Sequence, residues 1–215
     1  MNFSFEWWSF EVLALFCGIL PNPVQAISAN AILNIIATFS YVIYLGFSIA
    51  GSVRIGNAVG AGNAKLAKLA SLLSISLCTV SSLICATILL AFRTQIPKLF
   101  TKDESIQKLT TELMVVAAIF QIFDAVNAAF QEVMRGSGRQ DLAAKLNFIA
   151  YYIIGLPSSA ILGLGFKLGV LGLWIGITLG LAFISIIGLM ITIQSDWESL
   201  IIDAHERLAD VTESC

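Results

Sequence analysis

Charged residues are scarce in this chain. Only 12% of the 215 residues are Asp, Glu, Lys or Arg, a single histidine is present, and the formal net charge is −2. No run of like charge exceeds two residues, which argues against the basic surface that nucleic-acid binding requires. Hydrophobic residues make up 58% of the chain, and its mean hydropathy is +0.88, which is not typical of a soluble domain. The composition predicts an integral membrane protein.

Cysteine is also rare and irregularly placed. The four cysteines are Cys17, Cys78, Cys85 and Cys215. Their spacing fits neither a short-spaced metal site nor a dense disulfide framework. We therefore expect no metal site and interpret the cysteines as apolar fillers.

Six apolar stretches are long enough to cross a hydrocarbon core of about 30 Å, which takes about 20 residues. Prolines in "LPNP" end the first stretch, and Pro157 can kink the fifth. The sequence predicts an all-α integral membrane protein, with a six-helix transmembrane domain over residues 1–195 and a cytoplasmic tail over 196–215. The expected spans are about 3–20, 29–50, 66–92, 109–134, 146–165 and 168–193.

The orientation follows from the loop charges. Six spans place both termini on one side, which then carries seven Lys and Arg residues against five on the other. This difference favours cytoplasmic termini. A signal peptide is the alternative interpretation of "VLALFCGIL" followed by "VQA", but a positively charged leader is missing and Glu6 stands in its place. Because Met1 lies almost inside the first span, we expect the chain to be a piece of a longer one.

An internal pattern relates two of the predicted loops. "GAGNAKLA" from Gly60 and "GSGRQDLA" from Gly136 share the spacing G-x-G-x-x-x-L-A, 76 residues apart. The glycines permit tight turns. Two similar helix-turn-helix units would suit the internal repeats of transporters, and chance similarity is the alternative.

Three acidic residues, Glu6, Glu11 and Asp124, lie within predicted spans. A carboxylate at the bilayer centre costs roughly 2.5–3.5 kcal/mol, so it normally faces a water-filled cavity and carries function. An interfacial position is the alternative for Glu6. Residues five apart on a helix lie about 140° apart around its axis, so Glu6 and Glu11 cannot both point squarely into one cavity if the helix is regular. We expect only one of them to face the cavity and the other to face a neighbouring helix, unless the helix bends.

Other side chains near these acids extend the prediction. Glu132 lies one turn from Arg135, which predicts an ion pair at the helix end. A buried carboxyl group can exchange a proton near neutral pH, and aromatic faces attract cations. Aromatic residues therefore favour a site for protons and organic cations, with an interfacial belt as the alternative. They are Trp7, Trp8 and Phe10 on the first span, and Phe120 and Phe123 beside Asp124.

Five segments resemble, in order, the second half of eukaryotic multidrug and toxic compound extrusion (MATE) transporters of the MOP superfamily. They are "FEWWSFEVLALFCGILPNP", "GFSIAGSVRIGNAVGAGNAKLA", "FDAVNAAFQEVMRGSGRQ", "NFIAYYIIGLP" and "LGVLGLWIG". The resemblance implies twelve spans in two six-helix lobes. This chain then corresponds to the C-terminal lobe, spans seven to twelve, and the N-terminal six-helix lobe is missing from it.

The resemblance implies an antiporter, not an enzyme, with no catalytic residue. It would export organic cations, drugs or metabolites in exchange for protons, or for sodium in some members, without another cofactor. Glu6 and Asp124 match family acids that bind cations and protons, and Glu11 matches a further acid. Ile35 stands where some animal members carry Glu, and Gln131 and Glu132 replace small residues. Further candidates for the cavity lining are Trp7, Asn34, Tyr41, Gln121, Asn127 and Tyr152.

The expected partners are a small organic cation or metabolite, the missing lobe and the lipid bilayer, with no nucleic acid. The plasma membrane and a vacuolar or vesicular membrane both suit such a transporter. Two alternatives remain open: a truncated membrane subunit that does not transport, and a flippase for lipid-linked sugars. A flippase would favour basic cavity residues, whereas the charged residues central to these spans are acidic.

Overall fold

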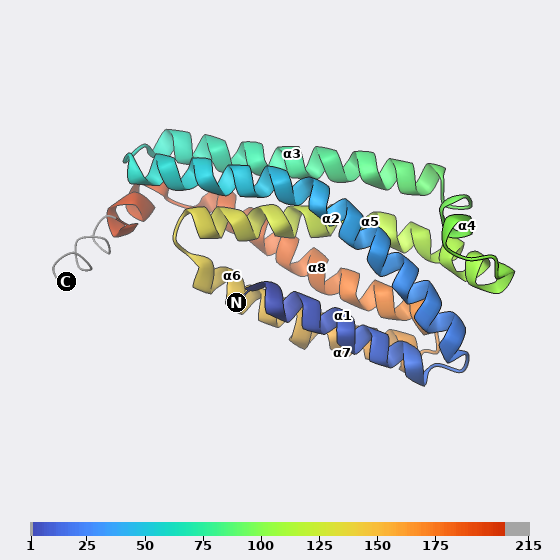
Figure 1. Cartoon of the computed structure of the whole chain (residues 1–215). Helices are drawn as coiled ribbons and strands as arrows, with labels where there is room; N and C mark the ends of the chain where they lie inside the picture. The colour runs from blue at the N-terminus through green and yellow to red at the C-terminus, as the bar shows by residue number, and fades with distance from the viewer. Residues whose placement is uncertain (1, 205–215) are drawn as a thin grey trace.

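The computed structural model describes residues 2–204, and within that range the chain is helical without strands (Figure 1). The prediction of an all-α protein is therefore confirmed. Four short connections, at residues 20–22, 61–63, 137–139 and 166–168, separate long helical segments, and the segment Gln140–Gly165 is composite. The elements are α1 (Asn2–Ile19), α2 (Pro23–Gly60), α3 (Ala64–Ala91), α4 (Ile96–Phe100), α5 (Glu104–Gly136), α6 (Gln140–Phe148), η1 (Ile149–Gly155), α7 (Leu156–Ala160), η2 (Ile161–Gly165) and α8 (Gly169–Gln194).

Five helical segments in the described range are long and apolar enough to cross a membrane. The shorter α1 has 18 residues and runs beside the composite segment Gln140–Gly165 (Figure 1). Several helices are longer than the predicted spans. Helix α2 begins at Pro23 and α5 begins at Glu104. The five segments are Pro23–Gly60, Ala64–Ala91, Glu104–Gly136, Gln140–Gly165 and Gly169–Gln194.

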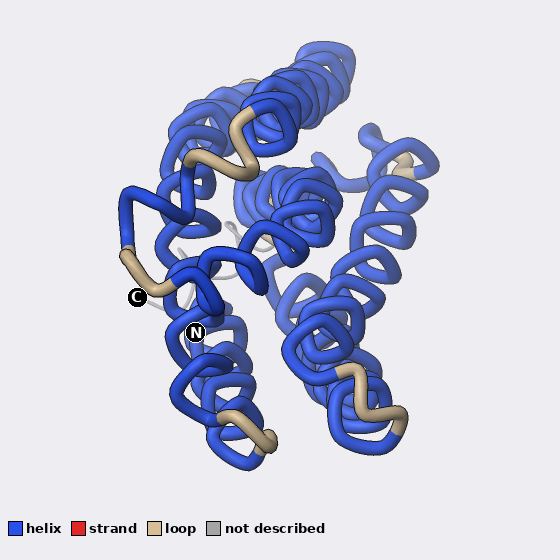
Figure 2. Tube along the Cα trace, turned by 90° about the vertical axis from the view of Figure 1, so that its right-hand side faces the viewer, coloured by secondary structure: helices blue, strands red, loops and turns tan. Residues whose placement is uncertain are grey.

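Helix α5 lies at the centre of the bundle. It packs against α2, α3 and α8, and Figure 2 shows the helical bundle from one end. Its buried positions include charged and amide side chains as well as apolar ones, among them Asp124 and Asn127. Polar residues on this helix are therefore held away from lipid by its neighbours.

The composite segment Gln140–Gly165 is a helix with two widened stretches, η1 and η2, on either side of α7. Both are π-helical, and Pro157 lies between them at the start of α7. Proline lacks an N–H, and its ring collides with the carbonyl four residues earlier in a regular α-helix. Widened turns accommodate such a disruption, so the helix continues through Pro157.

Two turns at one end of the bundle share a backbone conformation. Gly62 and Gly138 have φ angles of 68° and 72°. In each turn the next residue donates its N–H to the carbonyl five residues earlier, at 2.9 Å from Asn63 and 2.7 Å from Arg139. Glycine is the residue that most easily adopts a positive φ angle at the C-terminal end of a helix, because it has no Cβ atom. The repeated G-x-G-x-x-x-L-A pattern thus specifies two equivalent turns.

The connection from α3 to α5 is ordered. It contains α4 and ends in an N-terminal cap, in which Asp103 Oδ1 accepts from the Ser105 hydroxyl at 2.6 Å and from the Ser105 amide at 2.8 Å. The hydroxyl of Ser105 lowers the pKa of Asp103 most, followed by the backbone amides of Ser105 and Ile106.

The described part of the predicted tail packs on the core. Residues 197–204 are helical, with Trp197 and Ile201 buried. Arg207 and Cys215 lie outside the described residues. Cys17 and Cys78 are buried and Cys85 is half-buried, as expected for apolar fillers.

Substitution of Gly176 tests the packing of α8 on α7. A Cβ atom there would overlap the backbone of Ser158 and Ser159, so Gly176→Ala should lower the thermal midpoint by roughly 5 °C or more. Gly46→Ala is the matched control, because no heavy atom lies within 4 Å of the added Cβ. Circular dichroism in detergent measures both midpoints, and equal midpoints would contradict the packing.

The cap at Asp103 makes a prediction about pH. The folded-state pKa of Asp103 is lowered. The stabilisation that its carboxylate gives the cap is therefore complete above the unfolded-state pKa of about 3.9 and is lost as pH falls through the folded-state pKa. Hydrogen exchange, corrected for the intrinsic rate, should show Ser105 and Ile106 losing protection below about pH 4. Asp103→Asn keeps an acceptor without titrating and should remove this pH dependence.

Candidate functional site

A cavity of about 200 Å³ opens between α1, α2 and α5. Four of its lining residues come from α1, four from α2 and two from α5. Six of the nine predicted site residues are among them. The lining consists of Glu6, Trp7, Phe10, Glu11, Asn34, Ala37, Thr38, Tyr41, Phe120 and Asp124.

All three predicted acids border this cavity, and they differ in burial. Glu6 is 7% exposed and Asp124 is 3% exposed, whereas Glu11 is exposed. The expectation that only one of Glu6 and Glu11 faces the cavity was wrong. Trp7 and Phe10 lie between them around α1 and also line the cavity, so the cavity covers the whole arc of α1 from Glu6 to Glu11.

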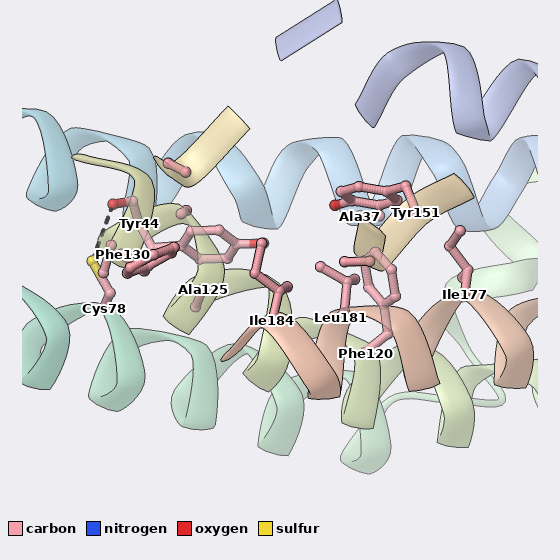
Figure 3. Close-up of a cluster of buried hydrophobic side chains, with 14 of the residues drawn as sticks. Ala37, Tyr44, Cys78, Phe120, Ala125, Phe130, Tyr151, Ile177, Leu181 and Ile184 are labelled. Carbon is pink, nitrogen blue, oxygen red and sulfur yellow. Dashed lines mark hydrogen bonds between the residues drawn. The ribbon is translucent and has the colours of Figure 1, made fainter. Parts of the chain in front are cut away.

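The carboxylate of Asp124 is held by Tyr44, whose hydroxyl donates to Asp124 Oδ2. The same hydroxyl lies 3.3 Å from Gln121 Oε1, so Gln121 supports the site without lining it. Cys78 Sγ in turn donates to the Tyr44 carbonyl at 3.4 Å (Figure 3). Sequence reasoning missed Tyr44, although it follows Tyr41 by three residues and therefore shares its helix face.

The side chain of Glu6 interacts with Gln131 of α5 and Tyr151 of η1. It also acts electrostatically on Asp124. The two carboxyl groups therefore belong to one electrostatic unit, although more than one hundred residues separate them in the sequence.

Aromatic contacts hold the apolar wall of the cavity. The Phe10 and Phe120 rings lie 6.0 Å apart with their planes at 73°, and both contact Trp174. The Trp174 indole N–H donates to Asn30 Oδ1 at 3.0 Å. Edge-to-face contacts of this kind fix ring orientation. Phe10 and Phe120 therefore pack against Trp174 on one side and line the cavity on the other.

Three predicted lining residues lie elsewhere. Gln121 is buried behind Tyr44, and Asn127 Nδ2 donates to Asn147 Oδ1 at 3.5 Å. Tyr152 stacks on Phe148 with ring centroids 5.2 Å apart. Adjacent residues point about 100° apart on a helix, so its neighbour Tyr151 faces Glu6 instead.

Other side chains singled out in the sequence occupy simpler positions. Trp8 is 66% exposed and Ile35 is 54% exposed, and neither lines the cavity. Arg135 Nη1 lies 2.7 Å from Glu132 Oε1, which confirms the predicted ion pair. Gln131 is buried against Glu6, so it contributes to the site and not only to packing.

Comparison with known proteins identifies the family. The MatE family model matches residues 1–161, most of the chain. The chain belongs to the MatE family. Protein DETOXIFICATION 14 of Arabidopsis thaliana is 36% identical over 203 residues, 94% of this chain and 42% of the relative. Human Multidrug and toxin extrusion protein 1 is 34% identical over 193 residues, 90% of this chain and 34% of the relative.

Solved MATE transporters have the same fold. The crystal structure of the eukaryotic MATE transporter AtDTX14 matches with a TM-score of 0.89 at 36% identity, over 94% of this chain and 45% of that one. The MATE transporter ClbM in complex with Rb+ matches with a TM-score of 0.85 at 17% identity, over 93% of this chain and 46% of that one. The chain is thus a multi-pass, MATE-type membrane protein that spans less than half the length of the relatives it matches.

Cysteine labelling tests whether water reaches the cavity. In a variant without native cysteines, Thr38→Cys should react with a hydrophilic maleimide, because Thr38 is exposed and lines the cavity. Ala29→Cys on the same helix should react at least tenfold more slowly, since Ala29 is fully buried. Mass spectrometry of the labelled chain measures both rates. Equal rates at the two positions would show that the cavity is not a separate aqueous space.

Proposed function

We propose that this chain is the C-terminal half of an antiporter that exports organic cations, drugs or metabolites in exchange for protons. The observation that carries the proposal is the meeting of Glu6 and Asp124, from α1 and α5, at one aromatic-lined cavity. The relatives named Multidrug and toxin extrusion proteins support the transported class. The N-terminal six-helix lobe of such a transporter would be its partner.

Electrostatics explain how the cavity could exchange its ligands. Two carboxylates close together in a medium of low dielectric constant repel each other strongly. Either a bound proton or a bound cation relieves this repulsion, so the two ligands compete for the same acids. Tyr44 supplies a hydroxyl donor to ionised Asp124, which steadies the carboxylate when an organic cation replaces the proton.

The aromatic side chains favour an organic cation as the exported ligand. Trp7, Phe10, Tyr41 and Phe120 line the cavity together with the acids, and a cation over an aromatic face gains roughly 0.5–2 kcal/mol when desolvated. Exposed Glu11 stands at the edge of the cavity and would attract cations into it. Sodium could replace the proton as the coupling ion, since carboxylate and hydroxyl oxygens also bind hard cations.

Two other functions fit the observations less well. A flippase for lipid-linked sugars would favour basic residues for the phosphates, and the charged residues that line this cavity are acidic. A membrane subunit that does not transport would not require both acids at one cavity. The most suitable membranes for the proposed exporter are the plasma membrane and vacuolar or vesicular membranes, with cytoplasmic termini.

Transport in proteoliposomes tests the proposal. The chain would be reconstituted alone and co-expressed with the N-terminal six helices of Arabidopsis DETOXIFICATION 14. A fluorescent organic cation should move against an imposed proton gradient when both halves are present. Asp124→Asn and Glu6→Gln should each reduce this exchange at least tenfold, because each removes a carboxylate that binds cation or proton.

Glu104→Gln is the matched control for these two variants. Glu104 is exposed in the first turn of α5 and does not line the cavity, so exchange should be unchanged. Full pH-dependent exchange by the Asp124 and Glu6 variants would refute the assignment of these acids. Absence of transport both by the chain alone and by the chain co-expressed with the N-terminal six helices would favour the non-transporting subunit.

A further inference from the structure

A second group of polar side chains surrounds Glu6 outside the cavity. It comes from α1, α5, α6 and η1, and each residue is at most 7% exposed. Each member has a buried polar atom without a hydrogen-bond partner, even though the group is polar throughout. We call the group the polar ring; its unpartnered atoms are Glu6 Oε2, Gln131 Oε1, Tyr151 Oη, Asn127 Oδ1 and Asn147 Nδ2.

The members of the polar ring are connected in space. Asn127 and Gln131 are one turn apart on α5, as are Asn147 and Tyr151 along α6 and η1. Asn127 Nδ2 donates to Asn147 Oδ1 at 3.5 Å, a weak bond that closes one side. On the other side, Gln131 and Tyr151 lie near enough to act on the Glu6 carboxyl group, but Glu6 Oε2 and Tyr151 Oη make no hydrogen bond of ordinary geometry. Five of the ten buried side-chain atoms without a hydrogen-bond partner in the described residues therefore belong to this one group, and the other five, on Ser74, Thr110, Gln121, Glu132 and Trp197, lie outside it.

The cost of this arrangement calls for ligands with hydrogen-bonding groups. A buried polar atom without a partner loses its hydration and gains no hydrogen bond in return, and native proteins contain few such atoms. Five in one group would be a heavy cost within a single bundle. A buried water typically makes about three hydrogen bonds to groups of this kind, so about two or three waters would satisfy the whole polar ring.

We propose that the polar ring is a binding site for ordered water, separate from the cavity between α1, α2 and α5. Glu6 belongs to both, so its carboxyl group is hydrated from the polar ring as well as from the cavity. The body of the Tyr151 ring is packed in the apolar core with Phe120 and Leu181 (Figure 3). Its hydroxyl is then the part of the side chain that meets the water.

The water site follows from hydrogen bonding and does not depend on transport. It also gives Gln131 a purpose that the family resemblance did not suggest, since small residues usually stand at this position. A small residue there would remove both the amide that contacts Glu6 and one wall of the polar ring.

Hydroxyl-radical footprinting tests the proposal directly, because radiolysis of a bound water modifies the side chain beside it. The full 215-residue chain in lipid nanodiscs would be irradiated with X-rays and the modified residues quantified by mass spectrometry. Tyr151 should be modified several-fold faster than Phe130, although both are 0% exposed. Phe130 is the internal reference, since its ring packs against Gly188 in the apolar core.

Variants distinguish the polar ring from general solvent entry. Gln131→Met keeps the side-chain length but removes the amide, and it should slow Tyr151 modification several-fold. Asn127→Leu should act in the same direction and serves if the first variant fails to fold. Thr110→Val is the matched control, because Thr110 is buried on the same helix with an unpartnered hydroxyl and lies about 30 Å away along the axis.

The outcomes separate cleanly. Fast modification of Tyr151 that falls in Gln131→Met and persists in Thr110→Val supports the water site. Modification no faster than that of Phe130, or equal rates in the wild type and both ring variants, would overturn it. Since footprinting does not measure transport, loss of the proposed antiport function would leave the water site standing, and the reverse also holds.

Discussion

The burial of the carboxyl groups of Glu6 and Asp124 among apolar helices is the constraint on which the site depends. Each ionised group must be compensated by donors, because the surrounding dielectric is low. Asp124 accepts a hydrogen bond from the Tyr44 hydroxyl, whereas Glu6 Oε2 has no such partner, although Gln131 and Tyr151 lie near enough to act on its carboxyl group. The buried polar side chains of α2, α5 and η1 near the site are thus arranged around these two acids.

Helix α5 makes this arrangement possible because it is enclosed by α2, α3 and α8. Four levels of the helix contribute to the site: Phe120 to the aromatic wall, Asp124 to the cavity, and Asn127 and Gln131 to the polar ring. A regular helix holds such residues at fixed heights and angles. The cavity and the polar ring therefore share one rigid support, with Glu6 of α1 joining them.

Much of the candidate site could be predicted from residue type, and its finer geometry could not. Acids within apolar stretches indicated Glu6, Glu11 and Asp124, because charge is costly there. The same reasoning could not separate Tyr151 from Tyr152 or find Tyr44, since no charge marks them. The helical angle between Glu6 and Glu11 also predicted that they face different surfaces. That prediction was wrong because the angle between two residues does not say how much of the circumference of α1 one cavity covers.

The sequence by itself determined the membrane class, the helical stretches and the turns at Gly62 and Gly138, because hydropathy, proline and positive φ are local properties. It also determined that two widely separated acids had to be sheltered. Only the tertiary structure decided which acids share a cavity, which tyrosine faces Glu6, and that Gln131 joins the polar ring. These depend on the rotation of each helix about its own axis, which packing against neighbouring helices sets.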